Sequence, residues 1–334
     1  MKIQEDEKFI RLVEGLVIPK EVSELIFFSG FKKLVPNSVF KKMLEKLSKN
    51  SPYMGFIIDP YSTFLFFKLK DIEKAKSFLP DRYELTKTKI FEDEEPEHYL
   101  GMGIFNTRAS TFWGSRLEVY LIAKDKKTGH PSWIFLDILS DTLIAIPKVG
   151  VTDKNCTNAM ITTSSKGDIL IDFKEDSTGR QLILKGNLNN GKMRPLHQPI
   201  WVAGNTSIGH RKDWSEKNDD PFAVIFDLAE VENALDIPID DIHLNKNTLF
   251  PDLAEPELVK VLCFPFTQHY IADSPGRRTY IKDNDDMIRN YVKVSNLKDI
   301  KTFSTKKIKG LLLFGMIFPI LSSIILFVLL MMNL

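Results

Sequence analysis

The sequence predicts a β-rich α+β protein, in which an antiparallel sheet or barrel is flanked by helices and followed by one C-terminal transmembrane helix. Many short segments rich in aromatic and β-branched residues are separated by turn residues, with few helices between them. This pattern favours antiparallel over doubly wound parallel pairing. The composition, 43% hydrophobic and 11% aromatic over 334 residues, suffices for a core. Residues 310–334 carry no charged side chain, which is typical of a membrane span.

Residues 1–54 are predicted to form an N-terminal helical segment. Within 21–28 and 39–47, apolar residues recur at spacings of three and four, with Lys and Glu between them, which indicates amphipathic helices. The first residues are acidic and contain no continuous apolar run, so we expect no secretory signal peptide. No motif in this segment indicates chemistry.

A β domain is predicted over residues 55–265. It begins with a strand at 63–69, dense in aromatic and β-favouring side chains. A short helix at 71–78 follows, with Asp71 as its N-cap and Pro80 just beyond its end. Turn sequences such as Lys-Thr-Gly and Asn-Asn-Gly separate further predicted strands at 99–105, 115–123, 133–139, 168–173, 181–185, 199–203 and 222–228.

The C-terminal part is predicted to be a polar stalk, residues 266–309, followed by a transmembrane helix, residues 310–332. The charge runs of the stalk are typical of solvated surface. At about 1.5 Å per residue, the apolar helix covers the roughly 30 Å hydrocarbon core of a bilayer. Pro319, Ser322 and Ser323 lie inside it, and membrane helices tolerate such residues. A buried helix of a soluble protein is the alternative, which the long uncharged run disfavours.

The charges that flank this helix predict its orientation. Four lysines precede it, namely Lys301, Lys306, Lys307 and Lys309, and no basic residue follows it. By the positive-inside rule, we expect a single-pass, tail-anchored membrane protein whose main domain faces the cytoplasm.

Charge and motif content argue against several classes of function. Lys and Arg total 45 against 44 Asp and Glu, a net charge of +1, so the overall charge gives no reason to expect a nucleic-acid partner. The two cysteines and six histidines lack the spacings of a disulfide framework or a metal site. Gly101 and Gly103 lack the third glycine of a dinucleotide fingerprint. We therefore expect no cofactor and no metal. The expected partners are a small-molecule ligand and the membrane, with a homo-oligomer left open.

Three stretches, in this order, resemble the acetoacetate decarboxylase superfamily. They are residues 64–80 with the following Tyr83-Glu84-Leu85, the strand around Glu118 with the later Ile146-Pro147-Lys148, and residues 221–262. The resemblance spans most of residues 55–265 and depends on order and spacing, since no single motif is diagnostic. It implies a cone-like antiparallel β-barrel with flanking sheets and helices, in agreement with the predicted strands.

The resemblance also implies a catalytic lysine. In the family, the first lysine of a Pro-Lys-Lys run condenses with the keto group of the substrate, and the protonated imine accepts the electrons released as carbon dioxide leaves. Here Pro147 and Lys148 match that run, whereas Val149 replaces the second lysine. Lys148 would then depend on apolar surroundings to lower its pKa. The alternative is a lysine at a strand edge with its ammonium group in water.

Glu118 is the best match to a family glutamate that handles protons in the cavity. Strand alternation places Arg116, Glu118 and Tyr120 on one face. Inside a barrel this face lines a polar cavity, and outside it is an ordinary solvated face. The resemblance favours the interior, with Arg116, Trp113 and Tyr120 as substrate-binding candidates, although Trp113 could equally fill the core.

The predicted function is that of a membrane-anchored, acetoacetate decarboxylase-like protein that binds a small oxo acid or carbonyl compound. A Schiff-base lyase reaction at Lys148 is one form of this prediction. A non-catalytic ligand-binding or scaffold protein on the same fold is the alternative, and another Schiff-base reaction, such as aldol or dehydration chemistry, is a third. Val149, and the absence of a second acid near Met102 and Gly103, favour these alternatives over decarboxylation of acetoacetate itself.

Overall fold

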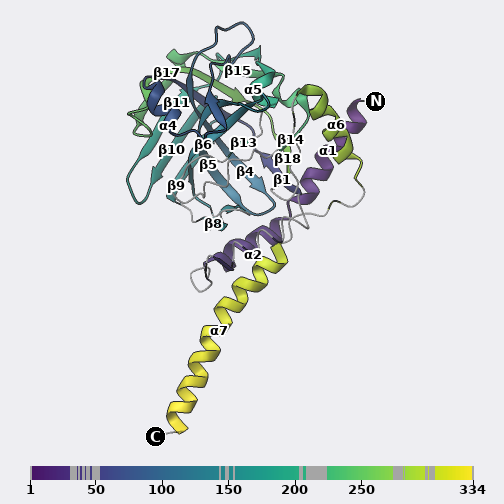
Figure 1. The fold of residues 1–334 in the computed structure, drawn as a ribbon, viewed down its shortest axis with the longest axis vertical. Helices are drawn as coiled ribbons and strands as arrows, with labels where there is room; N and C mark the ends of the chain where they lie inside the picture. Colours follow the sequence, from purple (N-terminus) through teal and green to yellow (C-terminus); the bar gives the residue numbers. More distant parts are fainter. Residues whose placement is uncertain are drawn as a thin grey trace.

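The structure is a computed structural model that describes residues 2–30, 53–142, 144–146, 150–152, 155–202, 206–207, 224–273, 281, 283–297, 300 and 305–332, with single positions between 36 and 46. Figure 1 shows the strands gathered in one β domain, helix α1 (Lys2–Leu16) beside it, and helix α7 (Thr305–Met332) extending away from it. The predicted β-rich fold with antiparallel sheets, flanking helices and one long apolar C-terminal helix is confirmed.

The larger sheet has 12 strands. They are β1 (Tyr53–Ile58), β2 (Ser62–Leu69), β3 (Tyr83–Leu85), β4 (Tyr99–Ala109), β5 (Trp113–Asp125), β6 (Pro131–Ser140), β12 (Lys192–Pro195), β13 (Thr206–Ser207), β14 (Val224–Ile225), β15 (Asn233–Ile237), β17 (Ala254–Phe264) and β18 (Gln268–Asp273). The main order is β12-β15-β17-β2-β4-β1-β18-β14, and β5 joins β4 to β6 and β3. Among the described strands, only the pairing of β13 with β6 is parallel.

A second sheet of four strands packs on the first. Its order is β16 (Ile242–Asn247), β11 (Gln181–Asn187), β10 (Asp168–Glu175) and β9 (Cys156–Thr163). Apolar side chains of both sheets share one core, for example Leu121 of β5 and Phe173 of β10. Arg180 joins the sheets, since its Nη2 lies 2.7 Å from Asp137 Oδ2 on β6 and 2.7 Å from Glu175 Oε2 on β10.

The other face of the large sheet encloses a second, aromatic core. Tyr120 of β5, Phe135 of β6, Phe264 of β17 and Ile271 of β18 belong to one buried cluster. Strands far apart in the sheet order therefore meet on this face, so the sheet curves around it. Strand β5 is consequently buried on both faces, which excludes the solvated-face alternative for Arg116, Glu118 and Tyr120.

Short helices occupy the connections. They are α4 (Ile72–Ser77), α5 (Gln198–Val202) and the 3-10 helices η3 (Leu228–Val231) and η4 (Ile239–Asp241). Asp71 caps α4 as predicted, because its carboxylate accepts a hydrogen bond of 2.8 Å from the backbone N–H of Lys74. The strand predicted at 199–203 is wrong, since residues 198–202 form α5.

The folded domain extends beyond the predicted boundary at residue 265. Strand β18 pairs with β1 and β14, and α6 (Asn284–Ser295) buries Met287, Tyr291 and Val294 in the aromatic core. The spacing of these three residues, four and then three, is that of an amphipathic helix. Much of the segment predicted as a polar stalk is therefore part of the domain.

Two helices, α1 and α2 (Pro19–Ser29), precede the β domain. Helix α1 packs on β1, β18 and α6, and the ring of Phe9 lies 4.7 Å from the ring of Tyr291 at an angle of 42°. Helix α2 instead contacts the start of α7. Of the region predicted as helical at 39–47, the structure describes only single positions. Helix α7 is long and apolar enough to cross a membrane over Lys306–Met332, where the mean hydropathy reaches 2.7.

Candidate functional site

Strand β5 places the predicted site residues on the aromatic face of the sheet. Glu118 pairs with Gly103 of β4 and Ile138 of β6. A glycine is needed opposite Glu118, because a Cβ at position 103 would lie 2.9 Å from the ring of Phe64 and 3.3 Å from that of Tyr120. Because Gly103 has no side chain, the rings of Phe64 and Tyr120 can pack over β4 beside the Glu118 carboxylate.

Arg116, Glu118 and Tyr120 contact one another. The Nη2 of Arg116 lies 3.1 Å from Glu118 Oε1, and the Tyr120 hydroxyl donates a hydrogen bond to Glu118 Oε2. All three residues are less than one tenth exposed. Burial and the nearby Glu118 carboxylate raise the pKa of Tyr120 well above its ordinary value, so the hydroxyl keeps its proton as a donor. The sequence predicted that Arg116, Glu118 and Tyr120 share one face of the strand. The structure shows in addition that Glu118 contacts both Arg116 and Tyr120.

Three buried N–H donors on this face have no hydrogen-bond partner in the described part of the chain. They are the Nε of Arg116, the Nε1 of Trp113 and the Nε1 of Trp201. The Arg116 guanidinium also lies 4.7 Å from the centre of the Phe112 ring. Buried donors in folded proteins are almost always paired. This set is therefore the most unusual feature of the aromatic core.

Aromatic rings form the rest of this face. The ring of Trp133 lies 5.1 Å from that of Tyr120 and 5.3 Å from that of Trp201, and Phe64 lies 5.0 Å from Trp201. Trp133 is itself paired, since its Nε1 donates a hydrogen bond of 2.7 Å to the carbonyl of Ile200. The sequence analysis missed Trp201, because it assigned the apolar run around it to a strand, although the run sits on helix α5.

Lys148 lies outside the described residues, together with its neighbours Pro147 and Val149. The strands on either side, β7 (Ile144–Ile146) and β8 (Gly150–Thr152), pair as a two-stranded sheet in which Ile146 faces Gly150. The preceding strand β6 ends at Ser140, which pairs with Arg116 of β5.

Gly114 permits the chain after β6 to pass close to β5. A Cβ there would lie 2.1 Å from Thr142 Cγ2, and the φ of Gly114 is +154°. The adjacent Ser115 N–H donates a hydrogen bond of 2.9 Å to the carboxylate of Asp141. The segment that leads to the hairpin is therefore held against the start of β5, next to Trp113 and Arg116.

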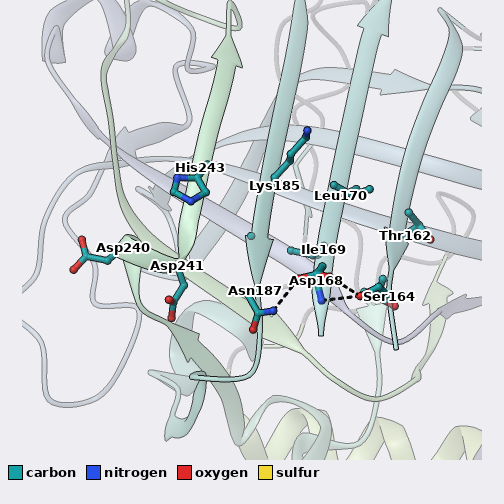
Figure 2. Close-up of a pocket in the computed structure, with 12 residues that line it drawn as sticks. Thr162, Ser164, Asp168, Ile169, Leu170, Lys185, Asn187, Asp240, Asp241 and His243 are labelled. Atoms are coloured by element: carbon teal, nitrogen blue, oxygen red, sulfur yellow. Dashed lines mark hydrogen bonds between the residues drawn. The ribbon is translucent and has the colours of Figure 1, made fainter. Parts of the chain in front are cut away.

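A separate pocket of about 650 Å³ lies on the four-stranded sheet. Figure 2 shows polar side chains along it, among them Thr162, Ser164, Asp168, Lys185, Asn187 and His243. The Asp168 carboxylate accepts hydrogen bonds from Asn187 at 2.9 Å and from Ser164 at 2.8 Å, and these bonds lower the pKa of Asp168. Asp168, Asn187 and Ser164 thus satisfy one another. In the described residues, no group of three or more His, Cys, Asp or Glu side chains could hold a metal ion.

Comparison with known proteins gives little further information. No family model matches the sequence, and no curated protein matches it. One solved structure that the fold resembles is the crystal structure of acetoacetate decarboxylase from Legionella pneumophila, at 11% sequence identity and a TM-score of 0.36. That alignment covers 65% of this chain and 84% of the decarboxylase chain. A likeness at this level supports no conclusion about activity.

Proposed function

We propose that the chain is a membrane-anchored, acetoacetate decarboxylase-like protein whose aromatic face binds a small carbonyl compound. The observation that supports this proposal is the set of three buried, unpaired donors on Arg116, Trp113 and Trp201. An unsatisfied buried donor costs about 1–3 kcal/mol. A ligand that brings acceptor oxygens to this face would recover that cost.

The surroundings of the donors define the chemistry of the ligand. Rings of Phe64, Tyr120 and Trp133 suit an apolar body. The charge of Arg116 is already compensated by Glu118, whose Oε1 lies 3.1 Å away. A second carboxylate beside Glu118 would be repelled by it. The oxygen nearest Arg116 is therefore a neutral carbonyl, and a carboxylate of an oxo acid would lie farther from Glu118.

A Schiff-base reaction at Lys148 is the second candidate. In the chain, Lys148 follows β6, whose last residue Ser140 pairs with Arg116, and Pro147-Lys148 matches the family run. In such a reaction the neutral lysine amine adds to the carbonyl carbon, one proton is taken up and water leaves, which gives a protonated imine. With a 3-oxo acid, the bond to the carboxylate breaks, its electron pair moves to the imine nitrogen as an enamine forms, and carbon dioxide leaves. Protonation at carbon and hydrolysis then return the lysine.

Helix α7 is proposed to anchor the chain by a single pass. Its side chains beyond Phe314 are largely exposed and apolar, a state that suits lipid and not water. The lysines at its start, Lys306, Lys307 and Lys309, lead us to propose that the β domain faces the cytoplasm.

Binding is tested on the full-length protein in detergent micelles, with a panel of 2-oxo acids, 3-oxo acids and the matching ketones. The variant Trp113→Phe removes one unpaired donor and keeps an aromatic ring. It should weaken binding by about fivefold to tenfold, the value of one hydrogen bond. The control His243→Gln, in the separate pocket, should bind as the wild type does. If no compound in the panel binds, or if Trp113→Phe binds as tightly as the control, the proposed site is wrong.

Reduction with borohydride distinguishes non-covalent ligand binding from a Schiff-base reaction at Lys148. Reduction of the protein with a bound oxo compound would fix an imine as a stable amine, which mass spectrometry assigns to a residue. A covalent adduct on Lys148 supports the Schiff-base reaction. A ligand that binds, depends on Trp113 and leaves no adduct on any lysine supports binding without that chemistry.

A further inference from the structure

A further polar residue, Tyr270 of β18, belongs to the face of the sheet that carries Glu118. Tyr270 pairs with Phe56 of β1, and Phe56 pairs with Ala109 of β4. Ala109 and Gly103 share a face of β4, because side chains alternate along a strand, and Gly103 pairs with Glu118. The register therefore places Tyr270 on the same face as Glu118, with β4 and β1 between their strands (Figure 1).

Contacts between aromatic rings connect Tyr270 to Arg116 across this face. The ring of Phe56 lies 6.3 Å from that of Tyr270 and 6.0 Å from that of Phe112. The guanidinium of Arg116 lies 4.7 Å from the centre of the Phe112 ring. On its other side, the Tyr270 ring lies 5.3 Å from that of Phe226. Arg116 and Tyr270 therefore lie on one continuous aromatic surface.

The Tyr270 hydroxyl is a hydrogen-bond donor that this surface leaves unused. Within the described residues it forms no hydrogen bond, and it is not one of their fully buried unpaired atoms. The side chain is only partly buried, so a small molecule can reach the hydroxyl. Burial and the charge of Glu230 raise the pKa of Tyr270 well above its ordinary value. The hydroxyl therefore keeps its proton and can donate it to an acceptor oxygen.

Two carboxylates restrict the charge of that acceptor oxygen. The charge of Glu230 acts on Tyr270. Tyr270 also contributes to the raised pKa of Tyr120, which places the two phenol groups near each other, and Tyr120 donates its hydrogen bond to Glu118. An anionic oxygen at Tyr270 would be repelled by both carboxylates, whereas an uncharged carbonyl oxygen would not.

We propose that Tyr270 donates a hydrogen bond to a second, uncharged carbonyl oxygen of the ligand. This inference rests on the proposed function, because it concerns the same site, where a first carbonyl oxygen lies beside Arg116. It narrows the class of ligand to carbonyl compounds with two uncharged acceptor oxygens, such as oxo esters and diketones. A free oxo acid and a simple ketone each lack one of the two.

The test compares two ligands in the wild type and in Tyr270→Phe. Methyl acetoacetate carries a ketone and an ester carbonyl. A methoxy ketone of the same chain length keeps the ketone but has a methylene group in place of the ester carbonyl. Calorimetry measures the affinity of each compound for the full-length protein in detergent micelles.

We expect the wild type to bind methyl acetoacetate about fivefold to tenfold more tightly than the methoxy ketone, the value of one hydrogen bond. In Tyr270→Phe the two compounds should bind equally. Tyr99→Phe is the matched control, since Tyr99 is buried at the other end of β4 from Ala109, and it should keep the wild-type preference. Because the Tyr270 hydroxyl has no partner among the described residues, Tyr270→Phe should also keep the thermal midpoint of the wild type.

The outcomes separate this inference from the proposed function. If the wild type binds both compounds equally and Trp113→Phe weakens both, the ligand site stands and the role of Tyr270 is wrong. A preference for methyl acetoacetate that persists in Tyr270→Phe would mean that another group binds the ester carbonyl, and it would also overturn the inference. So would acetoacetate that binds more tightly than its methyl ester. If neither compound binds, the proposed site is wrong and the role of Tyr270 falls with it.

Discussion

Both carboxylate oxygens of Glu118 are occupied inside the protein, one by Arg116 and one by Tyr120. This arrangement explains how a charged pair is kept in an aromatic core, because a buried charge is tolerated only when it is paired and hydrogen-bonded. It also explains why the sequence pattern alone did not decide whether Arg116, Glu118 and Tyr120 lie on a buried or a solvated face. Charged residues at alternate positions of a strand usually mark a solvated face, and nothing in residues 116–120 shows that they pair with one another.

At this scale we predict that Tyr120→Phe destabilises the protein by about 1–3 kcal/mol, because Glu118 Oε2 would stay buried without its donor. Equilibrium denaturation of the full-length protein in micelles measures the effect. Tyr99→Phe is the matched control, since Tyr99 is also buried but donates no hydrogen bond to a carboxylate in the described residues. Equal stability of Tyr120→Phe and wild type would show that the Glu118 contact contributes nothing.

At the scale of elements, the sequence predicted the strands of the large sheet better than the short helices α5 and α6. The strands at 99–105, 115–123 and 133–139 lie within β4, β5 and β6, because their aromatic and β-branched residues favour an extended chain. The run at 199–203 was misassigned, since a short apolar run fits a strand or a buried helical turn equally well. Helix α6 was missed because its three buried residues are separated by charged ones, which gives the segment a polar composition.

Docking of α1 onto the domain should depend on pH through His269. Its Nε2 lies 3.3 Å from Glu14 Oε1 of α1, and its Nδ1 lies 3.7 Å from Glu230 Oε1 of η3. Burial lowers the pKa of His269, but Glu230 and Glu14 outweigh it, so the net shift is upward. Arg108 pairs with Glu14 at 3.5 Å and with Asp59 at 3.1 Å, and Asp227 lies near Glu230.

The upward pKa shift determines the sign of the effect. The stabilisation is fully present below the unfolded pKa of about 6.5, and it is lost as the pH rises through the higher folded pKa. We therefore expect the thermal midpoint of the full-length protein to fall as the pH rises above neutrality. His269→Gln should remove this part of the pH dependence. A midpoint with the same pH profile in the variant and the wild type would contradict the role of His269.

At the scale of the whole molecule, we expect the β domain and α7 to be separable. Among the described residues, neither of the two cores contains a residue of α7, and the main contacts of α7 are with α2. The sequence predicted this division from the uncharged C-terminal run, but it placed the domain boundary too early. The reason is that β18 begins with the polar Gln268 and His269, although both are buried, and that α6 carries exposed polar residues beside its buried ones.

A chain truncated after residue 300 should therefore keep its fold and lose its anchor. We expect a circular dichroism spectrum dominated by strand and a cooperative thermal transition, although Val22 and Leu25 lose their cover on α7. Vesicle flotation measures membrane association, and the truncated chain should stay largely in the soluble fraction. A helix-dominated spectrum, or full membrane association of the truncated chain, would contradict the separation of the two parts.

The central claim is that the unpaired donors of Arg116, Trp113 and Trp201 mark a face that binds the acceptor oxygens of a small carbonyl ligand. The most direct measurement compares two compounds that differ only at that oxygen, a ketone that binds and its analogue with a methylene in place of the carbonyl. Binding to the full-length protein is followed by calorimetry and by tryptophan fluorescence. The account predicts that the ketone binds about tenfold more tightly or better, because the analogue leaves the donors unpaired. Equal affinity of the two compounds would contradict it.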